Sequence, residues 1–328
     1  MWILGNARRE LSSFYGLALT IIVFSGLWSN QPMPMAIILL VTVGIDTSHV
    51  YATAWRSWFV PSEVKRAKWL HIFTPLAIMI VIFLWCSLGI PGLWSAVLYL
   101  TVFHHIRQYY GIHRWSLAIN PNKGPMATKE LYAMSVLPFI GYHFRSDINY
   151  QGFFTPDDMF LFPNPEVLNL IYLLMAVAFI SLIYKISIAV KDKTISIPIL
   201  STVIFPVFIN IFCFLISKDF FITLLPVLAV HGMTYYHLSA LAQGKLKKGF
   251  WSKPRVAVAI IVSTSILFGF LESFLTEEQI DIIPSIQYQG NYLLAFGVAF
   301  VTTPAIYHYI ADAFLWKRTH PDFKKIVY

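Results

Sequence analysis

Residues 69–88 read WLHIFTPLAIMIVIFLWCSL, a stretch without any Asp, Glu, Lys or Arg. A helix rises about 1.5 Å per residue, so this stretch can cross the roughly 30 Å hydrocarbon core of a bilayer. Similar apolar stretches recur along the whole chain of 328 residues, of which 57% are hydrophobic and 12% are charged. Soluble domains carry about 25% charged residues, so this composition excludes a water-soluble globule. The apolar runs do not alternate with a period of two, which also excludes an outer-membrane barrel.

The apolar pattern predicts an all-α, polytopic bundle of about ten transmembrane helices, in one integral membrane domain of residues 1–328. The spans are expected at residues 14–28, 35–55, 69–88, 93–110, 131–144, 167–184, 195–216, 220–242, 256–271 and 292–316. The fifth stretch is short and contains Pro138. A tilted or re-entrant element is therefore the alternative to a crossing at that point.

The distribution of charge predicts the orientation of these spans. With ten crossings, all of the 24 Lys and Arg residues except Arg145 and Lys218 fall on the side of the N-terminus. Because positively charged loops stay in the cytosol, both termini are expected there. If the source is bacterial, the membrane is expected to be the inner one. The net charge is +8, but the basic residues flank the spans in small groups and build no single face. We therefore expect anionic membrane lipids as partners and exclude nucleic acid.

Ionisable side chains inside the predicted spans indicate a functional site, because such groups are costly in lipid. The carboxylates are Asp46 and Asp312, and eight of the ten histidines lie in spans or at their ends. These histidines are His49, His71, His104, His105, His113, His231, His237 and His308. Counted from the cytosolic ends of their helices, most of these groups lie roughly 6 to 14 Å deep. Five helices are therefore expected to present His or Asp in one shallow layer.

Helical spacing places some of these groups on shared faces. Asp46 and His49 stand at i, i+3, and His308 and Asp312 stand at i, i+4. Each pair supplies either two metal ligands, or one ligand and the carboxylate that orients its imidazole. His104 and His105 point about 100° apart, so one is expected to face the site and the other to support it. His231 and His237 are six positions apart, so they point in directions about 120° apart. His237 fits the layer better.

The histidine cluster predicts a metal site. Imidazole and carboxylate without thiolate suit iron, zinc, copper or manganese, and more than four ligands favour two metals. The expected ligands or close supports are Asp46, His49, His71, His104, His105, His231, His237, His308 and Asp312. The residues expected to position substrate or a bound oxygen species are Arg107, Gln108 and Tyr236.

Simpler interpretations remain open for these residues. A lone intramembrane histidine is often a hydrogen-bonded packing residue, and either carboxylate can pair with an arginine near the interface. Aromatic residues at the same depth, Tyr235 and Tyr307 among them, are expected in the interfacial belt, with a pocket wall or a hydrogen-bond donor as the alternative.

In this layout the chain resembles the histidine-rich integral-membrane di-iron oxygenases, the desaturases and hydroxylases that hold their metals on the cytosolic side. The H-x3-H and H-x2-H-H boxes of that group are absent, and His104 and His105 form only an adjacent pair. The resemblance implies an oxidoreductase, a monooxygenase or desaturase of lipid metabolism, with two irons and a lipid-like substrate. Electrons would come from a separate donor, because the sequence holds no Gly-rich dinucleotide fingerprint and no four-Cys cluster.

Two other classes of function fit the same residues. One is a zinc-dependent intramembrane hydrolase similar to ceramidase-like proteins, with three histidines on the zinc and an aspartate as general base. The other is non-enzymatic: a transporter, or a haem protein with paired axial histidines. A transporter often carries an inverted repeat, which this sequence does not display.

Overall fold

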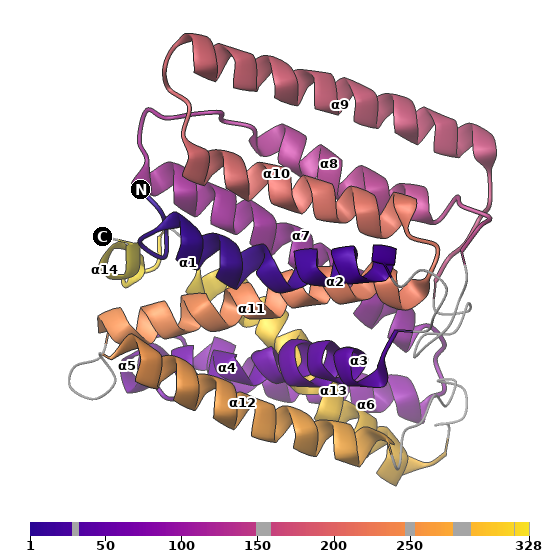
Figure 1. Ribbon diagram of the computed structural model, residues 1–328. Coiled ribbons are helices and arrows are strands. Elements are labelled where there is room, and N and C mark those ends of the chain that lie inside the picture. Colours follow the sequence, from indigo (N-terminus) through magenta and orange to yellow (C-terminus); the bar gives the residue numbers. More distant parts are fainter. Residues whose placement is uncertain (28–32, 149–158, 247–252, 278–289, 318, 328) are drawn as a thin grey trace. The chain divides into compact units, whose positions relative to one another are not determined.

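The computed structural model describes residues 1–27, 33–148, 159–246, 253–277, 290–317 and 319–327, and its regular structure there is helical (Figure 1). An isolated parallel bridge joins Gly124 and Ile195. Six helices in the described residues are long and apolar enough to cross a membrane. They are Met35–Arg56, Trp69–Ser87, Pro165–Lys191, Ile197–Ile216, Arg255–Glu272 and Tyr292–Leu315. The all-α class and the apolar character of these segments are thereby confirmed.

The other four predicted spans also coincide with helices. They are α2 (Leu17–Leu27), α7 (Leu93–Ile119), α8 (Thr128–Tyr142) and α11 (Phe220–Leu246). Pro138 lies inside α8 without ending it. Residue 28, the expected end of the first span, lies outside the described residues. The total of ten crossings and their orientation stay predictions.

The chain divides into two compact units, and each is described by itself. The first comprises Met1–Met35 and Phe103–His231, and the second comprises Ala36–Val102 and Gly232–Ile326. The chain passes from one unit to the other between Met35 and Ala36, within α7 and within α11. The single membrane domain stays a prediction.

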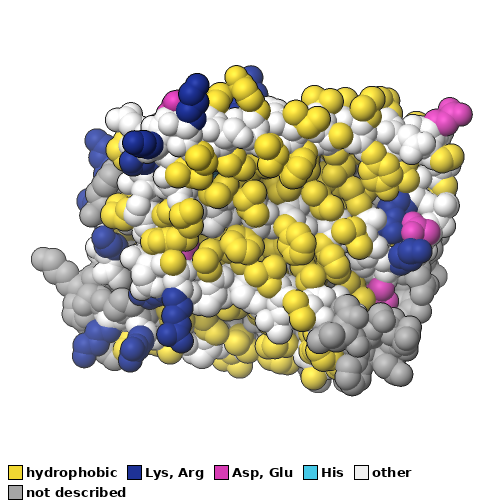
Figure 2. Space-filling view, turned by 45° about the horizontal axis from the view of Figure 1, so that its top comes forward, with side chains coloured by type: hydrophobic (Ala, Val, Ile, Leu, Met, Phe, Trp, Pro, Cys, Tyr) yellow, Lys and Arg dark blue, Asp and Glu magenta, His cyan; other side chains and the backbone are white. Residues whose placement is uncertain are grey.

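In the first unit, α9 (Pro165–Lys191) packs against α8, and α8 packs against α10 (Ile197–Ile211). Helix α9 begins at Asn164, whose side-chain oxygen accepts the N–H groups of Glu166 and Val167 at 3.0 and 3.1 Å. This is the expected N-cap arrangement. The helix exposes many large apolar side chains, such as Leu173 and Ile180. Figure 2 shows hydrophobic side chains spread over one face of the molecule, with Lys and Arg gathered toward its edges. A helix of this kind is stable in lipid rather than in water.

In the second unit, α13 (Tyr292–Leu315) packs against α6 (Thr74–Ser87). The core of this contact includes Ile82, Cys86, Ala295, Val298 and Ala299, all buried. Small side chains on α13 allow a close approach of the two helices, as is usual where helices pack in a bilayer.

A second helix contact in this unit depends on glycine. Helix α12 (Pro254–Glu277) packs against α4 (Ser48–Arg56). A Cβ atom on Gly269 of α12 would lie 2.9 Å from the Cα of Ser48. Gly232 makes a similar contact from α11, where a Cβ atom would lie 3.0 Å from the carbonyl oxygen of Ile45, just before α4. Larger residues do not fit at these two positions unless the backbone moves.

A π-helical turn at Thr42–Thr47 directly precedes α4 and carries Asp46. Such a turn inserts one residue into the helix and changes the direction in which the following side chains point. It therefore sets where His49, in the first turn of α4, projects.

Candidate metal centre

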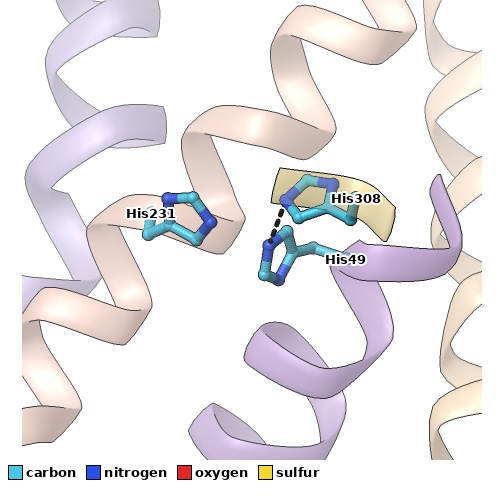
Figure 3. A group of neighbouring side chains, drawn as sticks. All are labelled: His49, His231 and His308. Atoms are coloured by element: carbon cyan, nitrogen blue, oxygen red, sulfur yellow. Dashed lines mark hydrogen bonds between the residues drawn. The ribbon is translucent and has the colours of Figure 1, made fainter. Parts of the chain in front are cut away.

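His49 and His308 face each other inside the second unit. Their Nε2 atoms lie 3.2 Å apart, joined by the dashed line in Figure 3, and both side chains are buried. The two rings are 4.8 Å apart and nearly perpendicular, at 82°. Two imidazole ligands of one tetrahedral zinc, each bound at about 2.0–2.1 Å, would place their nitrogens roughly 3.3 Å apart. The observed spacing fits this geometry, and it also fits an N–H···N hydrogen bond.

The other nitrogen of each ring is held by the protein. His49 Nδ1 lies 3.3 Å from the carbonyl oxygen of Ile45. A carbonyl oxygen only accepts, so this nitrogen carries the proton and Nε2 of His49 carries the lone pair. His308 Nδ1 lies 2.6 Å from the hydroxyl oxygen of Thr53.

Proton counting decides the direction of that second bond. The Tyr235 hydroxyl donates to Asp312 Oδ1 at 2.9 Å and lies 2.7 Å from the Thr53 hydroxyl. In the protonation state with Asp312 ionised, the only proton of Tyr235 goes to the carboxylate, and Thr53 then donates to Tyr235. Thr53 then has no proton left for His308, and Nδ1 of His308 must donate to Thr53. His308 therefore also presents a lone pair at Nε2.

In the state with Asp312 ionised, the two Nε2 lone pairs lie 3.2 Å apart and repel one another. A cation that both of them face, either a metal ion or a shared proton, removes this repulsion. Metal-binding histidines almost always donate their second ring N–H to a protein oxygen, and an oxygen lies beside Nδ1 of both His49 and His308. The tautomers that satisfy these hydrogen bonds are therefore those that a metal site requires.

The two predicted carboxylates lie on different sides of the imidazole pair. Asp312 Oδ1 accepts from Tyr235 and from the Trp316 indole N–H, the latter at 3.2 Å, and its Oδ2 lies 3.8 Å from Nε2 of His308. Asp46 Oδ1 instead lies 3.8 Å from Nδ1 of His49. Asp312 thus approaches Nε2 of His308, one of the two nitrogens that face each other, whereas Asp46 approaches Nδ1 of His49, which is turned away from them. The geometry suits Asp312 as a ligand and Asp46 as a support.

His71 belongs to a separate polar cluster of the second unit. Its Nε2 lies 3.1 Å from Glu63 Oε1, and its Nδ1 lies 2.7 Å from the Tyr307 hydroxyl. His320 Nε2 approaches the other carboxylate oxygen of Glu63 at 3.1 Å, and Arg66 Nε donates to that oxygen at 2.9 Å. Burial raises the pKa of Glu63, but the hydrogen bonds from His320, His71 and Arg66 outweigh it and hold that pKa well below its usual range.

Three predicted histidines meet in the first unit. The rings of His105 and His231 stack at 4.0 Å with an angle of 29°, and the ring of His104 meets that of His231 edge-on at 4.8 Å. Gln108 donates from Nε2 to the backbone carbonyl of His231 at 3.2 Å. All three histidines are buried. Stacked imidazoles do not direct their nitrogens at one point, so this trio differs from the facing pair of the second unit.

The remaining predicted residues have simpler surroundings. Arg107 is exposed, donates to the Tyr132 hydroxyl at 2.6 Å and lies over the ring of Tyr110. His237 Nδ1 bonds to the carbonyl of Met233 at 2.8 Å, one turn earlier in the same helix. Tyr236 is buried in an apolar cluster that includes its neighbour Tyr235.

Sequence reasoning missed two groups beside the imidazole pair. Nothing in the sequence pattern points to Thr53, whose hydroxyl lies beside His308. Tyr235 is expected first in the interfacial belt, but its hydroxyl donates to Asp312, which is the alternative role. Glu63 and His320, which bond to each other, were also missed because both lie outside the predicted spans.

No protein-family model, no curated protein and no solved structure matches this chain.

Proposed function

We propose that this chain is a metal-dependent membrane oxidoreductase, a non-haem iron oxygenase in which His49, His308 and Asp312 ligate the metal. The observation that carries the proposal is the pair of Nε2 atoms, 3.2 Å apart, in two buried rings whose Nδ1 atoms each lie beside a protein oxygen. Two histidines and one carboxylate are the donor set of non-haem Fe(II) oxygenases, which keep open positions for oxygen and substrate. When bound, such a metal supplies oxygen activation for attack on an unactivated C–H bond.

The residues of the chain would position the metal and exclude water. The bonds from His308 to Thr53, from Thr53 to Tyr235 and from Tyr235 to Asp312 tie two ligands together, so neither turns independently. Burial of His49 and His308 keeps bulk water away from their nitrogens, which protects a reactive oxidant.

Substrate, electron donor and topology complete the proposal. A site within apolar helices favours a lipid-like substrate that enters from the bilayer. The electrons would come from a separate cytosolic or quinone donor. The ten-span topology with cytosolic termini, in an inner membrane, would place the pair near the cytosolic face, where such a donor has access.

The number of metal ions is part of the proposal. The sequence prediction of two irons counts Asp46, His71, His104, His105, His231 and His237 as further ligands or supports. A stoichiometry of two irons per chain supports that larger set. A stoichiometry of one supports only the set of His49, His308 and Asp312.

A zinc-dependent hydrolase is the second candidate function, favoured by the same nitrogen spacing, which suits zinc as well as iron. Zinc in the purified protein, together with a turnover that persists without oxygen, would identify it. A Soret band would identify the haem alternative.

The test is metal content of the full chain, purified in mild detergent. His49→Ala and His308→Ala should each lose most of the metal while the protein still elutes as a single folded species. The matched control is His113→Gln, since His113 is also buried and bonds to the Thr202 hydroxyl at 3.0 Å. That variant should keep its metal. Wild-type metal content in both alanine variants would refute the proposed centre.

A further inference from the structure

A groove of about 570 Å³ lies between α8 and α9 in the first unit. Its apolar walls are formed by Ala133, Val136 and Leu137 of α8 and by Leu174, Val177 and Ala178 of α9. This volume is within the range of about 300–1,000 Å³ that small-molecule sites occupy. Val177 and Leu174 are exposed, so the groove opens toward the medium that surrounds the helices.

One end of this groove is polar. Lys129, Glu130 and Ser181 line it, and the buried Glu130 is satisfied by its neighbours. The Ser181 hydroxyl donates to Glu130 Oε1 at 2.7 Å, and Lys185 Nζ donates to Oε2 at 2.8 Å. Glu130 therefore neutralises Lys185 and holds the ends of the two helices together at this point.

Two more cations lie at the same end. Lys129 lines the groove and is exposed. Arg107 bonds to the hydroxyl of Tyr132, which also lines the groove. Lys185 is matched by Glu130, whereas Lys129 and Arg107 form no ion pair with the acidic residues that the structure describes. An apolar channel with a cationic end is complementary to an amphiphile with an anionic head.

We propose that this groove binds an anionic phospholipid of the membrane, with an acyl chain along Val136, Leu174 and Val177 and the head group beside Lys129 and Arg107. The polar end lies where α8 begins and α9 approaches its own end, the side that the charge bias assigns to the cytosol. Anionic lipids are concentrated in that leaflet. The proposal is independent of the metal centre.

The site can be located by photo-crosslinking. The full chain is reconstituted in phosphatidylcholine nanodiscs with a trace of phosphatidylglycerol that carries a diazirine in its acyl chain, and the labelled residues are mapped by mass spectrometry. We expect labels to concentrate on Val136, Leu174 and Val177. A phosphatidylcholine probe with the same chain should label these residues several-fold less.

Variants separate this site from ordinary lipid contact. Ala178→Trp fills the groove and should abolish the preferred labels, whereas Ala176→Trp, on the opposite face of α9 and exposed, should leave them unchanged. Lys129→Gln, at an exposed position that does not threaten folding, should reduce the preference for phosphatidylglycerol roughly fivefold. Its matched control is Lys191→Gln at the end of α9. This variant should keep the preference for phosphatidylglycerol.

Two results would overturn the proposal. One is equal labelling by the two probes, and the other is equal labelling of the groove and of Leu173 and Ile180 on the outward surface of α9. Either result would mean that lipid surrounds these helices without a specific site.

Discussion

The substitution Gly269→Ala tests whether the packing of α12 against α4 positions the proposed metal centre. A Cβ atom at residue 269 would lie 2.9 Å from the Cα and 3.0 Å from the Cβ of Ser48, where ordinary contacts are 3.4–4 Å. The backbone of α4 must therefore retreat by about half an ångström or more. Ser48 is the residue before His49, so this movement displaces the imidazole that faces His308.

Two magnitudes follow from this contact. Overpacking of this kind costs about 1–3 kcal/mol, which corresponds to a fall in Tm of roughly 1–5 °C for a chain of this size. Displacement of a metal ligand by the residues behind it typically weakens metal binding about 10- to 100-fold. Both quantities can be measured on one detergent preparation, by thermal unfolding and by competition with a metal chelator.

The matched control is Gly297→Ala on α13, the helix that carries His308. A Cβ atom there meets nothing within 4 Å. Because alanine favours a helix more than glycine does, this variant should unfold at the wild-type temperature or slightly above it. Equal Tm values for the two variants would refute the close approach of α12 to Ser48. A lower Tm with unchanged metal affinity would refute its coupling to His49.

Three further predictions concern titration and metal binding. Burial raises the pKa of Glu10 to about 7, so its ionisation destabilises the fold as pH rises through that value. Glu10→Gln should therefore raise the free energy of unfolding at pH 8 by at most about 3 kcal/mol. The same variant should change the free energy of unfolding little at pH 4. Glu63 has a depressed pKa, so its stabilisation is present above the unfolded pKa of about 4.3 and is lost as pH falls further. Glu63→Gln should lower stability by about 3 kcal/mol at pH 7, with a difference that shrinks below pH 4 in thermal unfolding. Thr53→Val removes the acceptor of the His308 N–H and should weaken metal binding about 10- to 100-fold in chelator competition.

The helices of this protein are largely readable from its sequence. Apolar stretches such as residues 69–88 have no stable conformation in lipid other than a helix, because every backbone N–H and C=O must be satisfied within the segment. Each predicted span coincides with a helix for this reason. The contact of Gly269 with Ser48 was not predictable, since a glycine in an apolar helix carries no local sign of its partner.

The candidate site was predictable only where its geometry is local. The pairs Asp46–His49 and His308–Asp312 follow from helical spacing. In each pair a carboxylate oxygen lies 3.8 Å from an imidazole nitrogen. That His49 meets His308 depends on how α4 and α13 pack, which the spacing of residues within one helix does not contain. Thr53 gives no signal either, because hydroxyl residues are common in membrane helices and usually bond to their own backbone.

The bonds around Glu63 make the end of the chain part of its interior. His320 is buried against Glu63, and Asp322 lies 3.4 Å from the guanidinium of Arg56, a fully buried side chain of α4. Deletion of the residues from 319 onward would leave both a carboxylate and a guanidinium without these partners in a poorly solvated region. Residues 320 and 322 are thus part of the packing around Glu63 and Arg56, although by sequence this segment looks like a solvated appendage.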